Sequence, residues 1–203
     1  MIKLTEPTLL LDKAKCLKNI AEIVEKAKRH NVELRPHFKT HQSHEIGRWF
    51  RNLGVEKITA SSLKMAEYFT EDGWKDITVA FPVNVHEIDR INFLAEKITL
   101  NLLVVASETI EKLANSLKFP VNIFIEVDCG DHRTGVNGGD FATIGNILSE
   151  INRFGLLNFK GFLTHGGHSY AVRGNKNALL DLHRKSVDSV TPLRDKYSTQ
   201  FPD

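Results

Sequence analysis

Lys39 lies in the part of this 203-residue chain that is richest in groups able to do chemistry, the segment from Leu34 to His41. The alternating, apolar residues 32–38 predict a buried strand, and residues 43–53 predict an amphipathic helix. We therefore expect Lys39 at the carboxyl end of a strand, where parallel α/β folds bind ligands. An amine that is partly shielded from water at such a place is a usable nucleophile or base.

Cationic and titratable side chains crowd Lys39 in the sequence. They are Arg35, His37, His41 and His44. Such a cluster is unfavourable unless a ligand, often an anionic one, offsets it, and this favours a site over an ordinary surface lysine. Three histidines with this spacing bind zinc when they share one helix. Because His37 falls in the predicted strand and His41 in the turn, we predict no metal site made wholly from this chain.

A second segment with candidate site residues runs from Glu126 to Val136 (Glu-Val-Asp-Cys-Gly-Asp-His-Arg-Thr-Gly-Val). It follows an apolar strand, and Gly130 and Gly135 supply backbone conformations that other residues resist. Arg133 is expected in the loop above the strand, where it can pair with a phosphate, a carboxylate or a ring atom. The alternative is a simple turn that carries a solvated arginine.

The third segment, Gly161 to Tyr170, places two histidines, adjacent glycines, a serine and a tyrosine just past another apolar strand. Glycines let a backbone approach a ligand closely, and the polar side chains supply directed hydrogen bonds. We predict that His165 and Tyr170 belong to a binding site. A Ser–His–Asp triad that uses Ser169 is disfavoured because no G-x-S-x-G motif is present.

The composition is that of an ordinary globular protein, with 41% hydrophobic and 26% charged residues. A net charge of +2, spread along the chain, gives no electrostatic reason to expect nucleic acid or an anionic membrane as a partner. Cys16 and Cys129 suggest neither a disulfide framework nor a zinc knuckle. No apolar run reaches membrane-spanning length and no signal peptide is evident, so we predict a cytoplasmic protein.

The apolar periodicity predicts strands alternating with helices. A short strand (8–11) and a helix (13–30) come first, and Pro192 is expected to kink or interrupt the last helix. Six strand–helix units follow, with strands at 32–38, 55–60, 76–81, 98–105, 121–127 and 159–164 and helices at 43–53, 62–72, 84–96, 107–118, 139–154 and 176–197.

Short connections and strands that are apolar on both faces are typical of a parallel sheet with helical crossovers. Such a sheet is either an open doubly wound sheet or a (β/α)8 barrel. The G-x-G-x-x-G and P-loop motifs are absent, and the candidate residues Lys39, Arg133 and His165 follow three different strands. That distribution favours the TIM-type barrel. Six units are two fewer than closure requires, so we predict that residues 1–203 are an incomplete N-terminal barrel domain.

These three segments, in this order, resemble the fold-type III pyridoxal-phosphate enzymes, which share the alanine racemase-like barrel. Arg35 to His41 resembles the segment that carries the cofactor lysine, and Asp128 to Val136 resembles a D-x-G-x-x-R-x-G-V segment. The closest resemblance is to the branch that contains D-serine dehydratase and D-threonine aldolase. Within it, the H-x-G-x-S-Y arrangement of His165 to Tyr170 resembles the dehydratase side more than the aldolase side. The resemblance covers essentially the whole chain.

The resemblance implies pyridoxal 5'-phosphate held as a Schiff base on Lys39, the catalytic residue. It also implies that His37 or His165 contacts the ring or its hydroxyl, and that Arg133 or Tyr170 tunes the pyridine nitrogen. The implied protein is a homodimer with strands seven and eight, the main phosphate-binding loops and a C-terminal β domain that holds a divalent metal, Zn or Mn.

The implied activity is that of a lyase on small β-hydroxy D-amino acids, most similar to D-serine dehydratase. A D-threonine aldolase, which cleaves its substrate to glycine and an aldehyde, is the first alternative. A non-catalytic pyridoxal-phosphate carrier and an inactive fragment are alternatives of another class.

Overall fold

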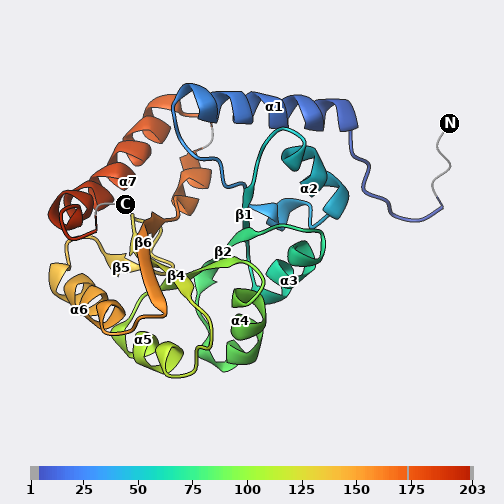
Figure 1. Cartoon of the computed structure of the whole chain (residues 1–203). Helices are drawn as coiled ribbons and strands as arrows, with labels where there is room; N and C mark the ends of the chain where they lie inside the picture. The colour runs from blue at the N-terminus through green and yellow to red at the C-terminus, as the bar shows by residue number, and fades with distance from the viewer. Residues whose placement is uncertain (1–4, 173, 202–203) are drawn as a thin grey trace.

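Parallel strands in the centre of the molecule are surrounded by helices in the computed structural model, which describes residues 5–172 and 174–201 (Figure 1). In chain order the elements are α1 (Lys13–Arg29), η1 (Phe38–Thr40), α2 (His44–Arg51), β1 (Lys57–Ala60), α3 (Leu63–Glu71), β2 (Asp76–Pro82), η2 (Val85–Glu87), α4 (Ile88–Ala95), β3 (Thr99–Val104), α5 (Ser107–Ala114), β4 (Val121–Asp128), β5 (Val136–Asn137), α6 (Phe141–Asn152), β6 (Leu157–Thr164), η3 (Gly167–Val172) and α7 (Lys176–Tyr197). The predicted alternation of strands and helices is confirmed.

The sheet has the order β1-β2-β3-β4, and β6 pairs with β4 on the side away from β3. All the pairings are parallel, and the two-residue strand β5 pairs with the end of β4. The path does not close within the described residues, so the sheet is an open part of a barrel. Its carboxyl ends carry the loops in which the sequence placed the candidate site.

One face of the sheet is apolar and packs against the helices. Ile58, Ile77 and Ile123 on three strands are fully buried there, as are Phe69 on α3 and Ile147 on α6. This separation of apolar surface from water is the main stabilising term of the fold, at about 25 cal/mol per Å² of buried apolar area. Because successive side chains of a strand point to opposite faces of the sheet, the residues that alternate with these apolar ones face the inside of the partial barrel.

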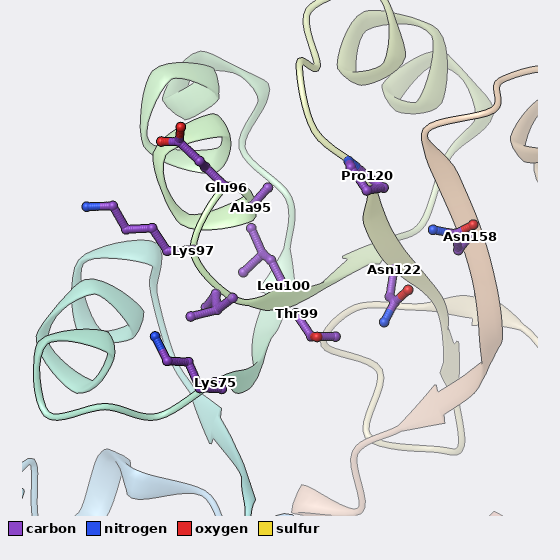
Figure 2. A pocket seen from close by; sticks show the side chains of 10 residues that line it. Lys75, Ala95, Glu96, Lys97, Thr99, Leu100, Pro120, Asn122 and Asn158 are labelled. Carbon is purple, nitrogen blue, oxygen red and sulfur yellow. The ribbon is translucent and has the colours of Figure 1, made fainter.

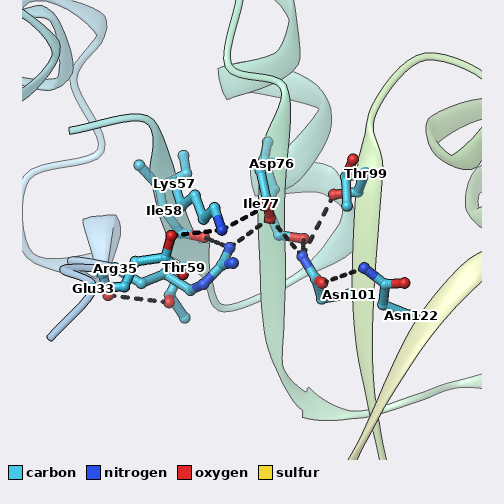
Figure 3. Close-up of polar contacts among 10 residues, drawn as sticks. All are labelled: Glu33, Arg35, Lys57, Ile58, Thr59, Asp76, Ile77, Thr99, Asn101 and Asn122. Carbon is cyan, nitrogen blue, oxygen red and sulfur yellow. Dashed lines mark hydrogen bonds and ion pairs between the residues drawn. The ribbon is translucent and has the colours of Figure 1, made fainter. Parts of the chain in front are cut away.

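The inward face is polar near the amino ends of the strands (Figure 3). Asn101 donates from Nδ2 to Asp76 Oδ1 at 2.7 Å, and Asn122 donates to Asn101 Oδ1 at 2.9 Å. Arg35 reaches the same Asp76 oxygen at 2.6 Å. A chain of hydrogen bonds therefore links the segment before η1 to three strands in succession.

Two predicted strands are wrong. Residues 8–11 form no strand, and Leu9 is 97% exposed, because no sheet edge within the described residues accepts the hydrogen bonds of this segment. Residues 32–37 form no strand and make only one isolated bridge, between His37 and Thr59, and Phe38 already begins the turn η1. Pro36 has no N–H to donate, which interrupts the ladder at this point.

Pro192 was expected to kink or interrupt the last helix, and the interruption is wrong, because α7 runs through Pro192 without a break. A proline in a helix removes one hydrogen bond and costs about 3 kcal/mol. The fully buried Leu193 follows directly, and its packing offsets that loss. The short strand β5 and the turn η3 are elements that the periodicity did not predict, because two to six residues are too few to show a period.

Among the described helices, none combines the length and the apolar character that a bilayer crossing requires.

Candidate functional site

Lys39 lies on the single turn η1, at the carboxyl end of the extended segment that precedes it. Its neighbour Phe38 is fully buried and packs edge-on against Phe69 and Trp74, with ring centroids 5.0 and 5.2 Å away. This aromatic anchor points toward the helices and leaves Lys39 on the other side of the turn. The Lys39 ammonium has no hydrogen bond or ion pair within residues 5–172 and 174–201.

The expected shielding of Lys39 from water is wrong, since its side chain is exposed. The cause is the open mouth of the sheet, where β1 has no second strand ladder beside it in the described structure. The segment before Lys39 is nevertheless attached to β1. Thr59 donates its backbone N–H to the carbonyl oxygen of Pro36 at 2.9 Å, and its Oγ1 to that of Arg35 at 3.4 Å.

Arg35 does not join the site, contrary to the expected crowding of charges around Lys39. Its guanidinium turns toward the amino ends of the strands and pairs with Asp76, with both side chains 20% exposed (Figure 3). Asp76 is further approached by the Lys57 ammonium at 3.8 Å, and Lys57 also pairs with Glu33 at 2.5 Å. The positive charge of Arg35 is therefore neutralised inside the protein, without a ligand.

His37 lies directly beside Lys39 and is half-buried. Its Nδ1 accepts the backbone N–H of Lys39 at 3.3 Å. Burial lowers the pKa of His37 to about 4, and the positive charges of Lys39 and His165 act in the same direction, while a backbone hydrogen bond to Thr59 opposes them. At neutral pH His37 is therefore uncharged and adds no positive charge beside the lysine.

The other two histidines of this segment do not converge on Lys39. The Nδ1 of His41 accepts from the Ser43 backbone at 3.1 Å, and burial lowers the pKa of this side chain. His44 bonds through Nε2 to the carbonyl oxygen of Tyr68 at 2.7 Å and stacks on the Tyr68 ring. Among the described residues, no three His, Cys, Asp or Glu side chains are placed to hold a metal ion.

The turn after β4 has the positive-φ backbone conformations that its glycines predicted. Gly135 has φ +106°, and a Cβ there would lie 2.6 Å from the backbone nitrogen of Asp128. Glu126, just before the turn, is 3% exposed, and its Oε2 accepts from Thr134 Oγ1 at 3.3 Å. Burial raises the pKa of Glu126, although Thr134, Arg133 and His165 act against this effect.

His165, at the end of β6, is held by the turn after β4. Its Nδ1 lies 3.0 Å from Asp131 Oδ2, and the Cys129 thiol donates to its carbonyl oxygen at 3.2 Å. Sequence reasoning missed both partners, which are more than thirty residues away along the chain. The only signal was that two polar segments follow strands of one parallel sheet, and it does not identify contacting pairs.

The remaining candidates are exposed. Arg133 lies in the turn, close enough to Glu126 to affect its pKa, and Tyr170 on η3 is 66% exposed. The structure thus brings His37, Lys39 and His165 to one end of the sheet, with Glu126 next to them. It places Tyr170 on the surface of the described residues.

A cavity of about 420 Å³ lies at the opposite, amino ends of the strands (Figure 2). Lys75, Lys97, Asn122 and Asn158 are among its lining residues. None of the candidate site residues lines it, so it is separate from the Lys39 end of the sheet.

Comparison with known proteins identifies the family. Residues 11–195 match the family described as alanine racemase, N-terminal domain. The chain belongs to this family. It is 30% identical over 179 residues to the D-threo-3-hydroxyaspartate dehydratase of Delftia sp. (strain HT23), covering 85% of this chain and 46% of that protein. It is 27% identical over 186 residues to the D-serine dehydratase of Dictyostelium discoideum, covering 82% of this chain and 46% of the relative.

A solved structure of the dehydratase from Delftia sp. HT23 superposes with a TM-score of 0.85 at 28% identity, over 94% of this chain and 51% of that one. The open sheet is therefore the family's α/β fold in part. The chain spans about half the length of the curated relatives it matches.

Proposed function

We propose that this chain is the N-terminal, lysine-bearing part of a pyridoxal-phosphate-dependent lyase that acts on β-hydroxy D-amino acids, with dehydration as its reaction. The observation that carries the proposal is Lys39, whose exposed amine has no partner among the described residues and lies at the carboxyl ends of the strands beside an uncharged histidine. The family and the names of two relatives, both dehydratases of D-amino acids, support it.

The donor set at the Lys39 end suits pyridoxal phosphate. The Lys39 amine would hold its aldehyde carbon covalently, and His37 and His165 would contact the ring. Arg133 and Tyr170 are exposed in this structure and stay the proposed partners of the pyridine nitrogen. Two buried polar atoms, His168 Nδ1 and Thr164 Oγ1, have no hydrogen-bond partner among the described residues and leave capacity for a ligand. Pyridoxal phosphate supplies an electron sink for charge that develops at the substrate's Cα.

The chain's own residues then divide the work. The amine of Lys39 would act as the general base that takes the proton from the substrate's Cα. His37 holds the backbone of the Lys39 turn through its Nδ1 and remains uncharged. Burial raises the pKa of the Glu126 carboxyl group, which lies within electrostatic range of His165 and Arg133.

Retro-aldol cleavage is the second candidate reaction, because the relatives include a D-threonine aldolase of Arthrobacter sp, 25% identical over 171 residues. We propose that two further strand–helix units, a β-rich domain and a divalent metal in that domain complete the enzyme, as a homodimer. A related dehydratase variant has been solved in what is described as its metal-free form, which supports a metal in the relatives.

The test has two stages. The chain is mixed with pyridoxal phosphate, reduced with borohydride and mapped by mass spectrometry. We expect the adduct on Lys39, its loss in Lys39→Ala, and its retention in Lys112→Ala, a change at an exposed lysine on α5. The longer protein is then assayed with D-serine, D-threo-3-hydroxyaspartate and D-threonine. A keto acid with ammonia supports dehydration, glycine with an aldehyde supports the aldolase, and an adduct absent from the longer protein would refute both.

A further inference from the structure

The pair formed by Asp131 and His165 joins the loops after β4 and β6. Their side chains are 20% and 32% exposed, and Asp131 Oδ2 lies 3.0 Å from His165 Nδ1. Gly167 passes over the pair so closely that a Cβ there would lie 2.5 Å from His165 Cε1 and 2.9 Å from Asp131 Oδ1. With the Cys129 thiol on the His165 carbonyl oxygen, both the ring and the backbone of His165 are fixed.

The hydrogen bonds at His165 Nδ1 determine where the imidazole carries its proton. The backbone N–H of Gly167 lies 3.2 Å from the same Nδ1 that faces Asp131. A neutral imidazole either donates from Nδ1 to Asp131 or accepts there from Gly167, but not both. An ionised carboxylate is the stronger partner, so the proton resides on Nδ1. Nε2 keeps its lone pair and has no partner within residues 5–172 and 174–201.

The free nitrogen belongs to the end of the sheet that carries Lys39. The pKa values of His37 and Glu126 are both sensitive to a charge on His165, so its ring lies within electrostatic range of both. Lys39 acts on His37 in the same way, and Arg133 acts on Glu126. Asp131, Cys129, His37 and Glu126 are therefore the charged or titratable groups shown near His165, with Lys39 and Arg133 beyond them.

We propose that Asp131 is a positioning residue, which holds His165 with a proton on Nδ1 so that Nε2 accepts a hydrogen bond from a hydroxyl group of the ligand. This inference rests on the proposed function. The hydroxyl has two possible sources with the same chemistry, the ring hydroxyl of the cofactor and the β-hydroxyl of the substrate. Fixing the tautomer of a histidine through its other nitrogen is a general way in which a carboxylate directs such a side chain.

The first test needs no cofactor. Long-range ¹⁵N–¹H NMR of the 203-residue chain reports the tautomer of each histidine, and His165→Gln assigns the signal. We expect the Nδ1–H form in the wild-type chain and a mixture in Asp131→Asn, because an amide can either donate to Nδ1 or accept from it. Asp128→Asn is the matched control. Asp128 pairs with His132 Nδ1 at 2.9 Å in the same turn, but the His132 side chain is 84% exposed. An Nε2–H form in the wild-type chain, or an unchanged tautomer in Asp131→Asn, overturns the proposal.

The second test uses the longer protein and separates the two sources of the hydroxyl. A hydrogen bond of 1–2 kcal/mol corresponds to about a 5- to 30-fold effect. If the hydroxyl is the cofactor's, Asp131→Asn weakens binding of pyridoxal phosphate by that factor. If it is the substrate's, cofactor binding is unchanged and kcat/KM for D-serine falls by that factor. A variant that changes neither overturns the proposal. If borohydride reduction of the wild-type protein with pyridoxal phosphate gives no adduct on Lys39, the proposed function is refuted, whereas the result on the His165 tautomer is unaffected.

Discussion

The ion pair between Arg35 and Asp76 is expected to hold the segment that carries Lys39 in place. This segment has one isolated bridge to β1 instead of a strand ladder, so its side-chain contacts replace missing backbone bonds. The two side chains are 20% exposed and 2.6 Å apart, and Asn101 donates to the same carboxylate. Exposed pairs contribute about 0–1 kcal/mol, whereas removing one partner of a buried pair costs about 3–5 kcal/mol.

The Arg35–Asp76 pair, with each side chain 20% exposed, lies nearer the energy of a buried pair than that of an exposed one. We expect Asp76→Ala to lower the free energy of unfolding by about 3 kcal/mol, since it leaves Arg35 without a counter-charge and removes one hydrogen bond. Arg35→Met should lower it by about 2 kcal/mol, because Lys57 and Asn101 still face Asp76. The double variant should lose about 3 kcal/mol in total, which is a coupling energy of about 2 kcal/mol.

Urea unfolding of the 203-residue chain at pH 7 measures these four free energies. The control cycle is Arg184→Met with Asp181→Ala, an exposed pair on α7 with an expected coupling below about 0.5 kcal/mol. Hydrogen exchange of the Thr59 amide, which bonds to Pro36, follows the Lys39 segment directly and should accelerate in Asp76→Ala. A coupling no larger than that of the control pair would refute the view that Arg35 and Asp76 hold this segment.

Two further predictions concern the same end of the sheet. The pKa of His37 is lowered from 6.5 to about 4 in the folded protein, so between these pH values the unfolded chain binds more protons than the folded one. The free energy of unfolding should therefore decrease as the pH is lowered from 6.5 to 4, by up to about 3 kcal/mol. The lowered pKa of His41 changes the stability in the same direction, and the raised pKa of Glu126 changes it in the opposite direction. His37→Gln isolates the contribution of His37. Urea unfolding at a series of pH values measures it, and an equal dependence of the unfolding free energy on pH in the wild type and this variant would contradict the assignment. Gly135→Ala should lower the free energy of unfolding by about 3 kcal/mol or more, since φ is +106° and the added Cβ would meet the backbone of Asp128. Gly54→Ala, at φ +85° and with open space around the added Cβ, should lower it by about 1 kcal/mol. Thermal unfolding compares these two variants, and equal losses would show that the close contact at Gly135 relaxes without strain.

Several features of the fold were predictable from the sequence because they depend on local patterns. The strand β4 and the helix α6 are long and strongly periodic, and their bounds differ from the prediction by only one or two residues. The position of Lys39 just after an extended segment also followed from the residues around it. The predictions failed where a segment needs a neighbouring strand to become part of the sheet. The apolar leucines of residues 8–11 predicted a strand, but this segment has no neighbouring sheet edge in the described structure.

The site divides in the same way. The sequence by itself determined the family, the strand–helix alternation and the three segments whose side chains gather at one end of the sheet, because the carboxyl ends of parallel strands must lie on the same side. Tertiary structure alone decided that Arg35 turns away to Asp76 and that Asp131 and Cys129 hold His165. It also decided that His37 is uncharged. These outcomes depend on burial and on contacts between residues far apart in the chain, and no local spacing of amino acids records either.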